Sequence, residues 1–179
     1  MSDTSERNAM NDETEVRRAT EADLEEVVAL WSHYIRAHRE NPAYRPAPDA
    51  LAERKEFFRR HIRGEESAVF VIARKDGGLD GMLTCFVEDN LPYFQPPQYA
   101  RFQTPYVRPD ARKRGNLKRL LSAGFRWARE LEMTELRMFT GADNVLANEI
   151  ADELGFRAVE VMRRRPLDWS EPPEDQIDG

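Results

Sequence analysis

The sequence has one cysteine, Cys85, among 179 residues. A single thiol excludes an intrachain disulfide and a cysteine-based zinc site. No apolar run approaches the roughly 18 residues that a membrane-spanning helix needs. The first fifteen residues lack the basic start and apolar stretch of a secretion signal. These absences predict a cytoplasmic protein that binds neither metal nor membrane.

Charge is unevenly distributed along the chain. Acids outnumber bases by 33 to 27, but residues 1–14 hold four acids and one base, and residues 168–179 hold five acids and no base. Between these ends the chain carries 24 acids and 26 bases. The polar, aperiodic ends predict two disordered acidic tails. The length suits one domain, which we place at residues 15–167.

Hydrophobic periodicity predicts an alternation of strands and helices. The expected strands are 15–19, 68–73, 81–88, 100–107, 135–140 and 158–167, and the expected helices are 24–38, 50–63, 117–131 and 143–154. The order β-α-α-β-β-β-α-β-α-β is typical of an α/β fold. We expect three layers, with a mixed central sheet and helices on both of its faces.

Local signals refine the two N-terminal helices. Thr20 followed by Asp23 is close to a capping box, which predicts where the first helix begins. In the second helix the spacing predicts that Leu51, Phe58 and Ile62 face the core.

The segment with the most chemical information is VRPDARKRGNL, residues 107–117. It joins a strand to an amphipathic helix, so its backbone N–H groups lie at a helix N-terminus, which favours a phosphate or pyrophosphate. Residues 108–119 hold six bases against one acid, and Gly115 lets the backbone approach a ligand oxygen. The segment has neither the Gly-Lys-Ser/Thr of a Walker loop nor the three glycines of a dinucleotide fingerprint. Anion binding and a merely solvated basic turn both remain open on this pattern.

Pro105 lies inside the strand that leads into this segment. Proline cannot donate a hydrogen bond to a neighbouring strand, so we expect a bulge or unpaired backbone at this position.

Three blocks of the sequence resemble the GNAT superfamily of acetyl-CoA-dependent N-acetyltransferases. The loop Arg112-Lys113-Arg114-Gly115 is similar to the family's Arg/Gln-x-x-Gly-x-Gly/Ala motif. A second block, similar to the family's Asn-x-x-Ala…Leu-Gly-Phe helix, comprises Asn144, Ala147, Ile150, Leu154, Gly155 and Phe156. The opening Val16-Arg17-Arg18-Ala19-Thr20 and Asp23-Leu24 resemble the first strand and helix. The resemblance covers residues 15–167.

The resemblance implies a cofactor, a reaction and a set of residues. The pyrophosphate of acetyl-CoA would bind the loop amides, its pantetheine arm would pair along the fourth strand, and an amine of a small molecule or protein would attack the thioester directly in a ternary complex. The implied cofactor-binding residues are Tyr106, Val107, Arg112, Lys113, Arg114, Gly115, Asn116, Leu117 and Asn144. A homodimer is plausible by the same resemblance.

Two positions depart from the family pattern. Leu117 stands where the loop usually has Gly or Ala, and Ala151 stands where many members have a tyrosine that protonates the departing thiolate. A thiolate with a pKa near ~8.5 can leave without full protonation, so turnover need not be lost. A catalytically weak or silent acyl-CoA-binding regulatory module is therefore the alternative function.

A general base is also needed, because an alkyl ammonium must lose a proton before it attacks. Residues 101–107 contain no acid, and Glu88 at the end of the preceding strand is the nearest candidate together with Asp89. Glu88 could instead hold a cationic substrate by its charge, or simply end a strand in a solvated loop.

The remaining polar and aromatic residues receive simpler interpretations. Cys85 alternates with apolar neighbours and is expected to be a buried structural thiol. The three histidines, His33, His38 and His61, are expected to be ordinary helix residues without metal.

The loop 89–99 and the run 163–165 each leave a functional question open. Tyr93, Phe94 and Tyr99 either line an acceptor pocket or pin the loop. The arginines at 163–165 are expected to be edge charges of the last strand, and the modest charge of the central region argues against nucleic-acid binding.

Overall fold

The structure is a computed structural model that describes residues 14–165. The chain divides after Phe139 into two compact units, and each is described by itself. The elements of the first unit are β1 (Thr14–Arg18), η1 (Glu21–Asp23), α2 (Leu24–Ala37), η2 (Pro42–Tyr44), α3 (Ala50–Arg63), β2 (Ser67–Arg74), β3 (Leu79–Asp89), β4 (Gln98–Val107), η3 (Pro109–Ala111), α4 (Asn116–Glu130) and β5 (Leu136–Met138). The second unit contains α5 (Val145–Glu153).

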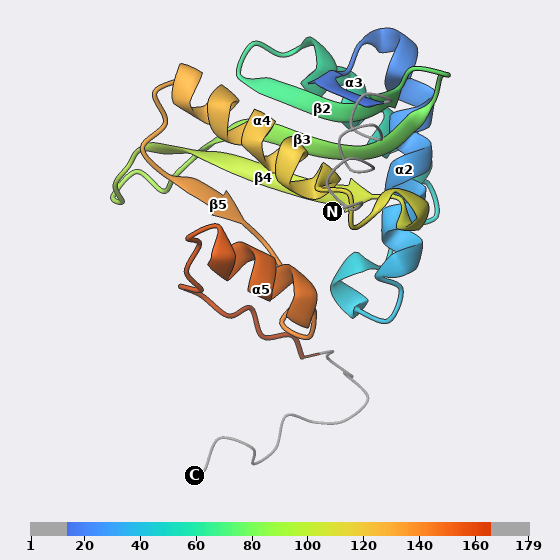
Figure 1. The fold of residues 1–179 in the computed structure, drawn as a ribbon. Helices are drawn as coiled ribbons and strands as arrows, with labels where there is room; N and C mark the ends of the chain where they lie inside the picture. Colours follow the sequence, from blue (N-terminus) through green and yellow to red (C-terminus); the bar gives the residue numbers. More distant parts are fainter. Residues whose placement is uncertain (1–13, 166–179) are drawn as a thin grey trace, which may run out of the picture. The chain divides into compact units, whose positions relative to one another are not determined.

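The first unit is built on a mixed five-stranded sheet with the order β1-β2-β3-β4-β5 (Figure 1). The pairs β1–β2, β2–β3 and β3–β4 are antiparallel, and β4–β5 is parallel. A parallel pair needs a crossover connection, which α4 supplies between β4 and β5. The predicted mixed sheet is therefore confirmed.

Helices cover both faces of this sheet, because alternate residues of each strand point to opposite sides. On one face α2 and α3 pack their apolar side chains, including Trp31 and Phe58, against Val69, Val71 and Met82. This contiguous cluster is the larger part of the core.

On the opposite face α4 crosses the sheet (Figure 1). Its Gly124 lies directly against Phe102 and Leu83, and Phe125 contacts the Phe102 ring edge-on with centroids 5.5 Å apart. The expected three-layer α/β fold is confirmed.

The capping box at the start of the first helical segment forms as expected. Asp23 accepts hydrogen bonds from the backbone N–H and the hydroxyl of Thr20, at 2.7 and 2.9 Å. The sequence did not reveal a further partner, Arg17, whose guanidinium donates to both carboxylate oxygens of Asp23 at 2.7 and 2.8 Å.

The expected inward face of α3 is partly wrong. Phe58 is fully buried and Ile62 packs against the core, but Leu51 is 57% exposed. Ala50 takes the inward place in the first turn, so the apolar stripe passes through Ala50 and Phe57 rather than through Leu51.

The expected last strand, Ala158–Leu167, is wrong for the part that the structure describes, because residues 158–165 form no strand. Val159, Val161 and Met162 are 88%, 68% and 77% exposed. Alternation shows that a segment could form one side of a sheet, but a strand also needs a neighbour for its backbone groups. The arginines expected to be edge charges at 163–165 thus lie outside any sheet.

In the second unit, α5 ends as the sequence predicts, with Gly155 in the left-handed conformation at φ +84°. Apart from Thr14, the predicted tails lie outside the described residues, and the single domain over 15–167 stays a prediction. Within residues 14–165 no helix is both long and apolar enough to span a bilayer.

Candidate active site

The segment between β4 and α4 forms the basic turn and helix N-terminus that its sequence predicts. Gly115 is the N-cap of α4 at φ +77°, and Lys113 two residues earlier is also left-handed at φ +62°. The first helical hydrogen bond runs from the N–H of Arg119 to the carbonyl of Gly115, so the preceding N–H groups of α4 have no partner within the helix. A Cβ built on Gly115 would meet nothing within 4 Å, so the space beside the N-cap residue is open.

The buried side-chain amide of Asn116 supports the loop through hydrogen bonds. Asn116 is only 3% exposed, and its Nδ2 donates to the carbonyl of Ala111 at 3.0 Å. Its Oδ1 accepts from Arg119, which also donates to the hydroxyl and the carbonyl of Thr14 at 2.8 Å. The side chain of Asn116 therefore fixes the shape of the loop, and only its backbone N–H remains for a ligand.

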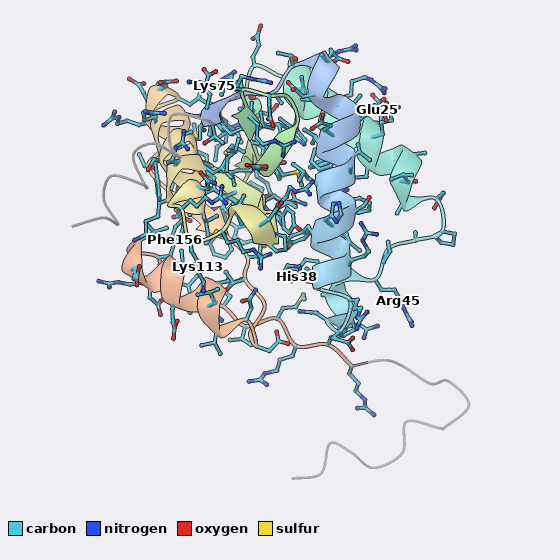
Figure 2. The ribbon with its side chains drawn as sticks, turned by 45° about the vertical axis from the view of Figure 1, so that its right-hand side comes forward. Glu25, His38, Arg45, Lys75, Lys113 and Phe156 are labelled. Carbon is cyan, nitrogen blue, oxygen red and sulfur yellow. The ribbon has the colours of Figure 1, made fainter. Side chains whose placement is uncertain are left out.

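Arg112 turns back toward the strand that precedes the loop. Its Nε donates to the carbonyl of Val107 at 3.0 Å, and its guanidinium lies 5.9 Å from the ring centroid of Tyr106. Arg112, Lys113 and Arg114 are all exposed, but no side-chain hydrogen bond of Lys113 or Arg114 to a described residue is shown; Figure 2 labels Lys113 on this loop. The positive charge available to a ligand thus comes from Lys113 and Arg114, while Arg112 connects loop and strand.

The bulge expected at Pro105 is confirmed. Met82 of β3 pairs with Tyr106, but Thr84 pairs with Gln103, so Thr104 and Pro105 together stand opposite one β3 residue. Thr104 has φ +57°, an unusual value for a β-branched residue.

Beyond the start of β4, no strand that the structure describes pairs with its outer edge, which we call the open edge. β5 pairs with β4 only at residues 100–102. Residues 103–107 have no strand partner on that side within the described part of the chain, so their outward backbone groups can pair with an extended ligand, although the Val107 carbonyl already accepts from Arg112. This edge runs through Tyr106 and Val107 straight to the loop, as the resemblance implies.

A cluster of aromatic rings lies on the α2 side of this strand. The Tyr34 ring meets Tyr106 edge-on at 6.3 Å, and lies 4.3 Å from His38 and 5.6 Å from Tyr44. Burial and a hydrogen bond to Tyr44 raise the pKa of Tyr34, so this phenol stays neutral. Sequence reasoning did not assign this cluster a role, although His38 and Tyr34 fall on the apolar stripe of their helix.

The structure brings Glu88 to Arg101 rather than to the bulge. Its carboxylate accepts from the Arg101 guanidinium at 2.7 Å. Glu88 pairs with Tyr99, five residues before Thr104, which is roughly 16 Å along the strand. The burial of Tyr99, and after it the charge of Glu88, raise the pKa of that phenol. The role of Glu88 as base stays a prediction, and Arg101 already occupies its carboxylate.

The remaining predicted residues divide between core and surface. Tyr99 belongs to β4 and is buried, whereas Tyr93 and Phe94 are 75% and 53% exposed in the connecting loop, with ring centroids 4.8 Å apart. Cys85 is buried as expected, and burial raises the pKa of its thiol, which makes it a poor nucleophile.

Within the second unit, Asn144 caps α5. Its side-chain oxygen accepts from the N–H of Ala147 at 3.2 Å, and Ala151 is buried in the same helix. Contact of Asn144 with a cofactor stays a prediction.

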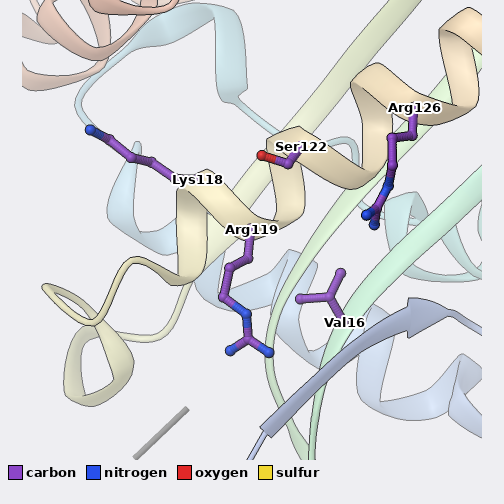
Figure 3. A pocket seen from close by; sticks show the side chains of 5 residues that line it. All are labelled: Val16, Lys118, Arg119, Ser122 and Arg126. Carbon is purple, nitrogen blue, oxygen red and sulfur yellow. The ribbon is translucent and has the colours of Figure 1, made fainter. Parts of the chain in front are cut away.

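A separate hollow of about 390 Å³ lies between α4 and the opposite edge strand, β1. It is lined by Val16, Lys118, Arg119, Ser122 and Arg126 (Figure 3). β1 is at the far edge of the sheet from β5, so this cationic hollow is not part of the open edge of β4.

A mixed sheet whose bulged fourth strand leads through a basic turn into a helix N-terminus is the arrangement that the resemblance to N-acetyltransferases implies. The sequence model of the Acetyltransferase (GNAT) family matches residues 27–156. The chain belongs to this family and is an acyltransferase.

Solved structures share the fold at low sequence identity. The aminoglycoside 6'-N-acetyltransferase AAC(6')-Ih of Acinetobacter baumannii is 17% identical, with a TM-score of 0.67 over 87% of this chain and 98% of that one. AAC(6')-Iy in complex with a CoA-containing bisubstrate analog is 21% identical, with a TM-score of 0.65 over 86% and 99%. A Bacillus halodurans protein is 19% identical, with a TM-score of 0.74 over 86% and 99%. No curated protein matches the sequence.

Proposed function

We propose that this acyltransferase moves an acetyl group from acetyl-CoA to a primary amine. The observation that carries the proposal is the open edge of β4, residues 103–107, which continues directly into the N-terminus of α4 at Gly115. The amide-containing pantetheine arm suits such an edge, because it can exchange hydrogen bonds with a strand. The pyrophosphate suits the helix N-terminus that follows.

Loop charge and geometry support the same cofactor. Lys113 and Arg114 are exposed in the loop, and the side chain of Asn116 is held by its hydrogen bond to the carbonyl of Ala111. Leu117, where the family usually has a smaller residue, is half-buried in the first turn of α4. The solved relatives AAC(6')-Iy and AAC(6')-Ih, whose names describe amine acetylation, share this fold.

In the proposed reaction both substrates are bound at once. The neutral amine nitrogen attacks the thioester carbonyl, the N–C bond forms, and the C–S bond breaks with its electron pair leaving on sulfur, while one nitrogen proton passes to the sulfur or to water. The thiolate can depart without a strong acid, which is consistent with Ala151 at the usual tyrosine position. Ala151 also motivates the alternative, a module that binds acyl-CoA without turnover.

Gly115→Asp tests the cofactor site, because it places a carboxylate in front of the amides. Gly77→Asp is the matched control: Gly77 is at φ +97°, has equally open surroundings and lies in the β2–β3 turn. Both variants carry the same charge and comparable backbone strain. We expect Gly115→Asp to abolish acetyl-CoA binding, measured by calorimetry, and Gly77→Asp to bind like the parent protein.

Turnover is measured as release of free CoA thiol with a panel of primary amines. Release with at least one amine, lost in Gly115→Asp and kept in Gly77→Asp, is the expected result. Binding without release for any amine would favour the regulatory module. Equal binding by both variants would contradict the proposed cofactor site.

A further inference from the structure

Transfer to an amine requires a group that removes a proton from the ammonium, and the three carboxylates described near β4 in the first unit are already paired. Residues 103–107 contain none. Glu88 is bound to Arg101, and the buried Asp80 beside the end of β4 is bound to Arg74 at 2.6 Å. Asp110, past the end of the strand, is exposed and pairs with Arg108.

His38 offers a basic nitrogen instead. It follows the last residue of α2 (Figure 2), and its Nδ1 lies 2.8 Å from the carbonyl oxygen of Tyr34. Because a carbonyl only accepts, Nδ1 must carry the hydrogen, so in the neutral ring the lone pair is on Nε2. Nε2 makes no hydrogen bond to any residue that the structure describes.

Ring contacts connect His38 to β4 through Tyr34. The imidazole is half-buried between Tyr34 at 4.3 Å and Tyr44 at 5.0 Å. Tyr34 contacts Tyr106, whose backbone belongs to the open edge of β4. Burial, and after it the Tyr44 hydroxyl, raise the pKa of Tyr34, so this phenol stays protonated.

We infer that His38 is the proton acceptor for the acetyl-accepting amine. This inference rests on the proposed function. Nε2 takes one proton from the ammonium, directly or through one water, and the freed electron pair on nitrogen attacks the carbonyl. As the C–S bond breaks, the second nitrogen proton passes to the departing sulfur, and the imidazolium returns its proton to water. The tyrosine faces around His38 also suit the positive charge of the incoming ammonium.

The experiment measures how fast the parent protein and His38→Gln acetylate two acceptors. One is a primary alkylamine that the parent protein acetylates, and the other is an alkoxyamine, which is already neutral at the assay pH. Removing a general base costs roughly 10²–10⁴-fold in rate. We expect a loss of that size in kcat with the alkylamine and a loss of less than about threefold with the alkoxyamine. The KM for acetyl-CoA should not change.

His33→Gln is the control, since His33 is exposed on the same helix and contacts Arg36. It should leave both rates unchanged. Equal losses for the two acceptors in His38→Gln, or no loss at all, would overturn the inference while the parent protein's turnover upholds the proposed function. A parent protein that acetylates neither acceptor nor any panel amine would overturn both.

Discussion

Replacing Asp23 by Asn tests how the start of α2 is stabilised. The Asp23 carboxylate accepts two hydrogen bonds from Arg17 and two from Thr20, and its side chain is 11% exposed. The hydrogen bonds from Arg17, more than any other contact, lower its pKa from 3.8 to about 2. A shift of this size corresponds to about 2 kcal/mol, which the partial exposure of Arg17 reduces to about 1–2 kcal/mol.

The sign of the pH dependence follows from the lowered pKa. Above pH 4 the carboxylate is charged in both the folded and the unfolded chain, and its full contribution to the free energy of unfolding is present. As the pH falls through about 2, the folded state must take up the proton and the contribution is lost.

The assay is urea unfolding of the parent protein and Asp23→Asn at several pH values. Asn keeps the shape and can still accept from Thr20 through its oxygen, but it loses the charge and one acceptor for Arg17, so the difference reports the Arg17–Asp23 pair. We expect the parent to be more stable by about 1–2 kcal/mol at pH 7, with the difference shrinking toward pH 2. A difference that stays constant from pH 7 to pH 2 would refute the assignment of the stabilisation to the Arg17–Asp23 pair.

Two other substitutions test the packing. Gly124→Ala would place a Cβ 2.5 Å from Cζ of the buried Phe102, so overpacking of about 1–3 kcal/mol should exceed the helix-propensity gain of about 1 kcal/mol, and urea unfolding should show net destabilisation. The exposed Ser122→Ala on the same helix should be neutral or slightly stabilising, and a stabilised Gly124→Ala would show that α4 is not packed this tightly. His61 stacks on Phe86 at 4.8 Å, and burial lowers its pKa from 6.5 to about 4. Since only the unfolded chain gains this proton between pH 6.5 and 4, stability should fall over that range, and His61→Phe should flatten the fall when thermal melts are compared. An unchanged pH dependence in the variant would assign the fall to other groups.

The sequence predicted the parts of the fold that depend on neighbouring residues. The capping box at Thr20, the bulge at Pro105 and the helix end at Gly155 each follow from the chemistry of one or two side chains. The loop up to Gly115 was predictable for the same reason, since a strand, a basic turn with glycine and an amphipathic helix follow one another directly.

Contacts between distant segments were beyond such reasoning. Arg119 donates to Thr14, 105 residues away, and nothing in the local pattern marks it as a support of the loop rather than a ligand of phosphate. The side-chain nitrogen of His38 that carries the hydrogen is fixed by its distance to one carbonyl, which no spacing encodes. The alternation around Val159 predicted a strand, but alternation does not reveal whether a partner exists.

The most direct test of the central claim is a thermal melt of the protein with acetyl-CoA, with ATP as the control for simple polyphosphate binding. A ligand at a hundred times its Kd adds about 2.7 kcal/mol, which raises the midpoint of a domain of this size by roughly 5–11 °C. A shift of this size with acetyl-CoA and little with ATP is the predicted result. No shift with acetyl-CoA at saturating concentration would contradict a cofactor site formed by the β4 edge and the N-terminus of α4.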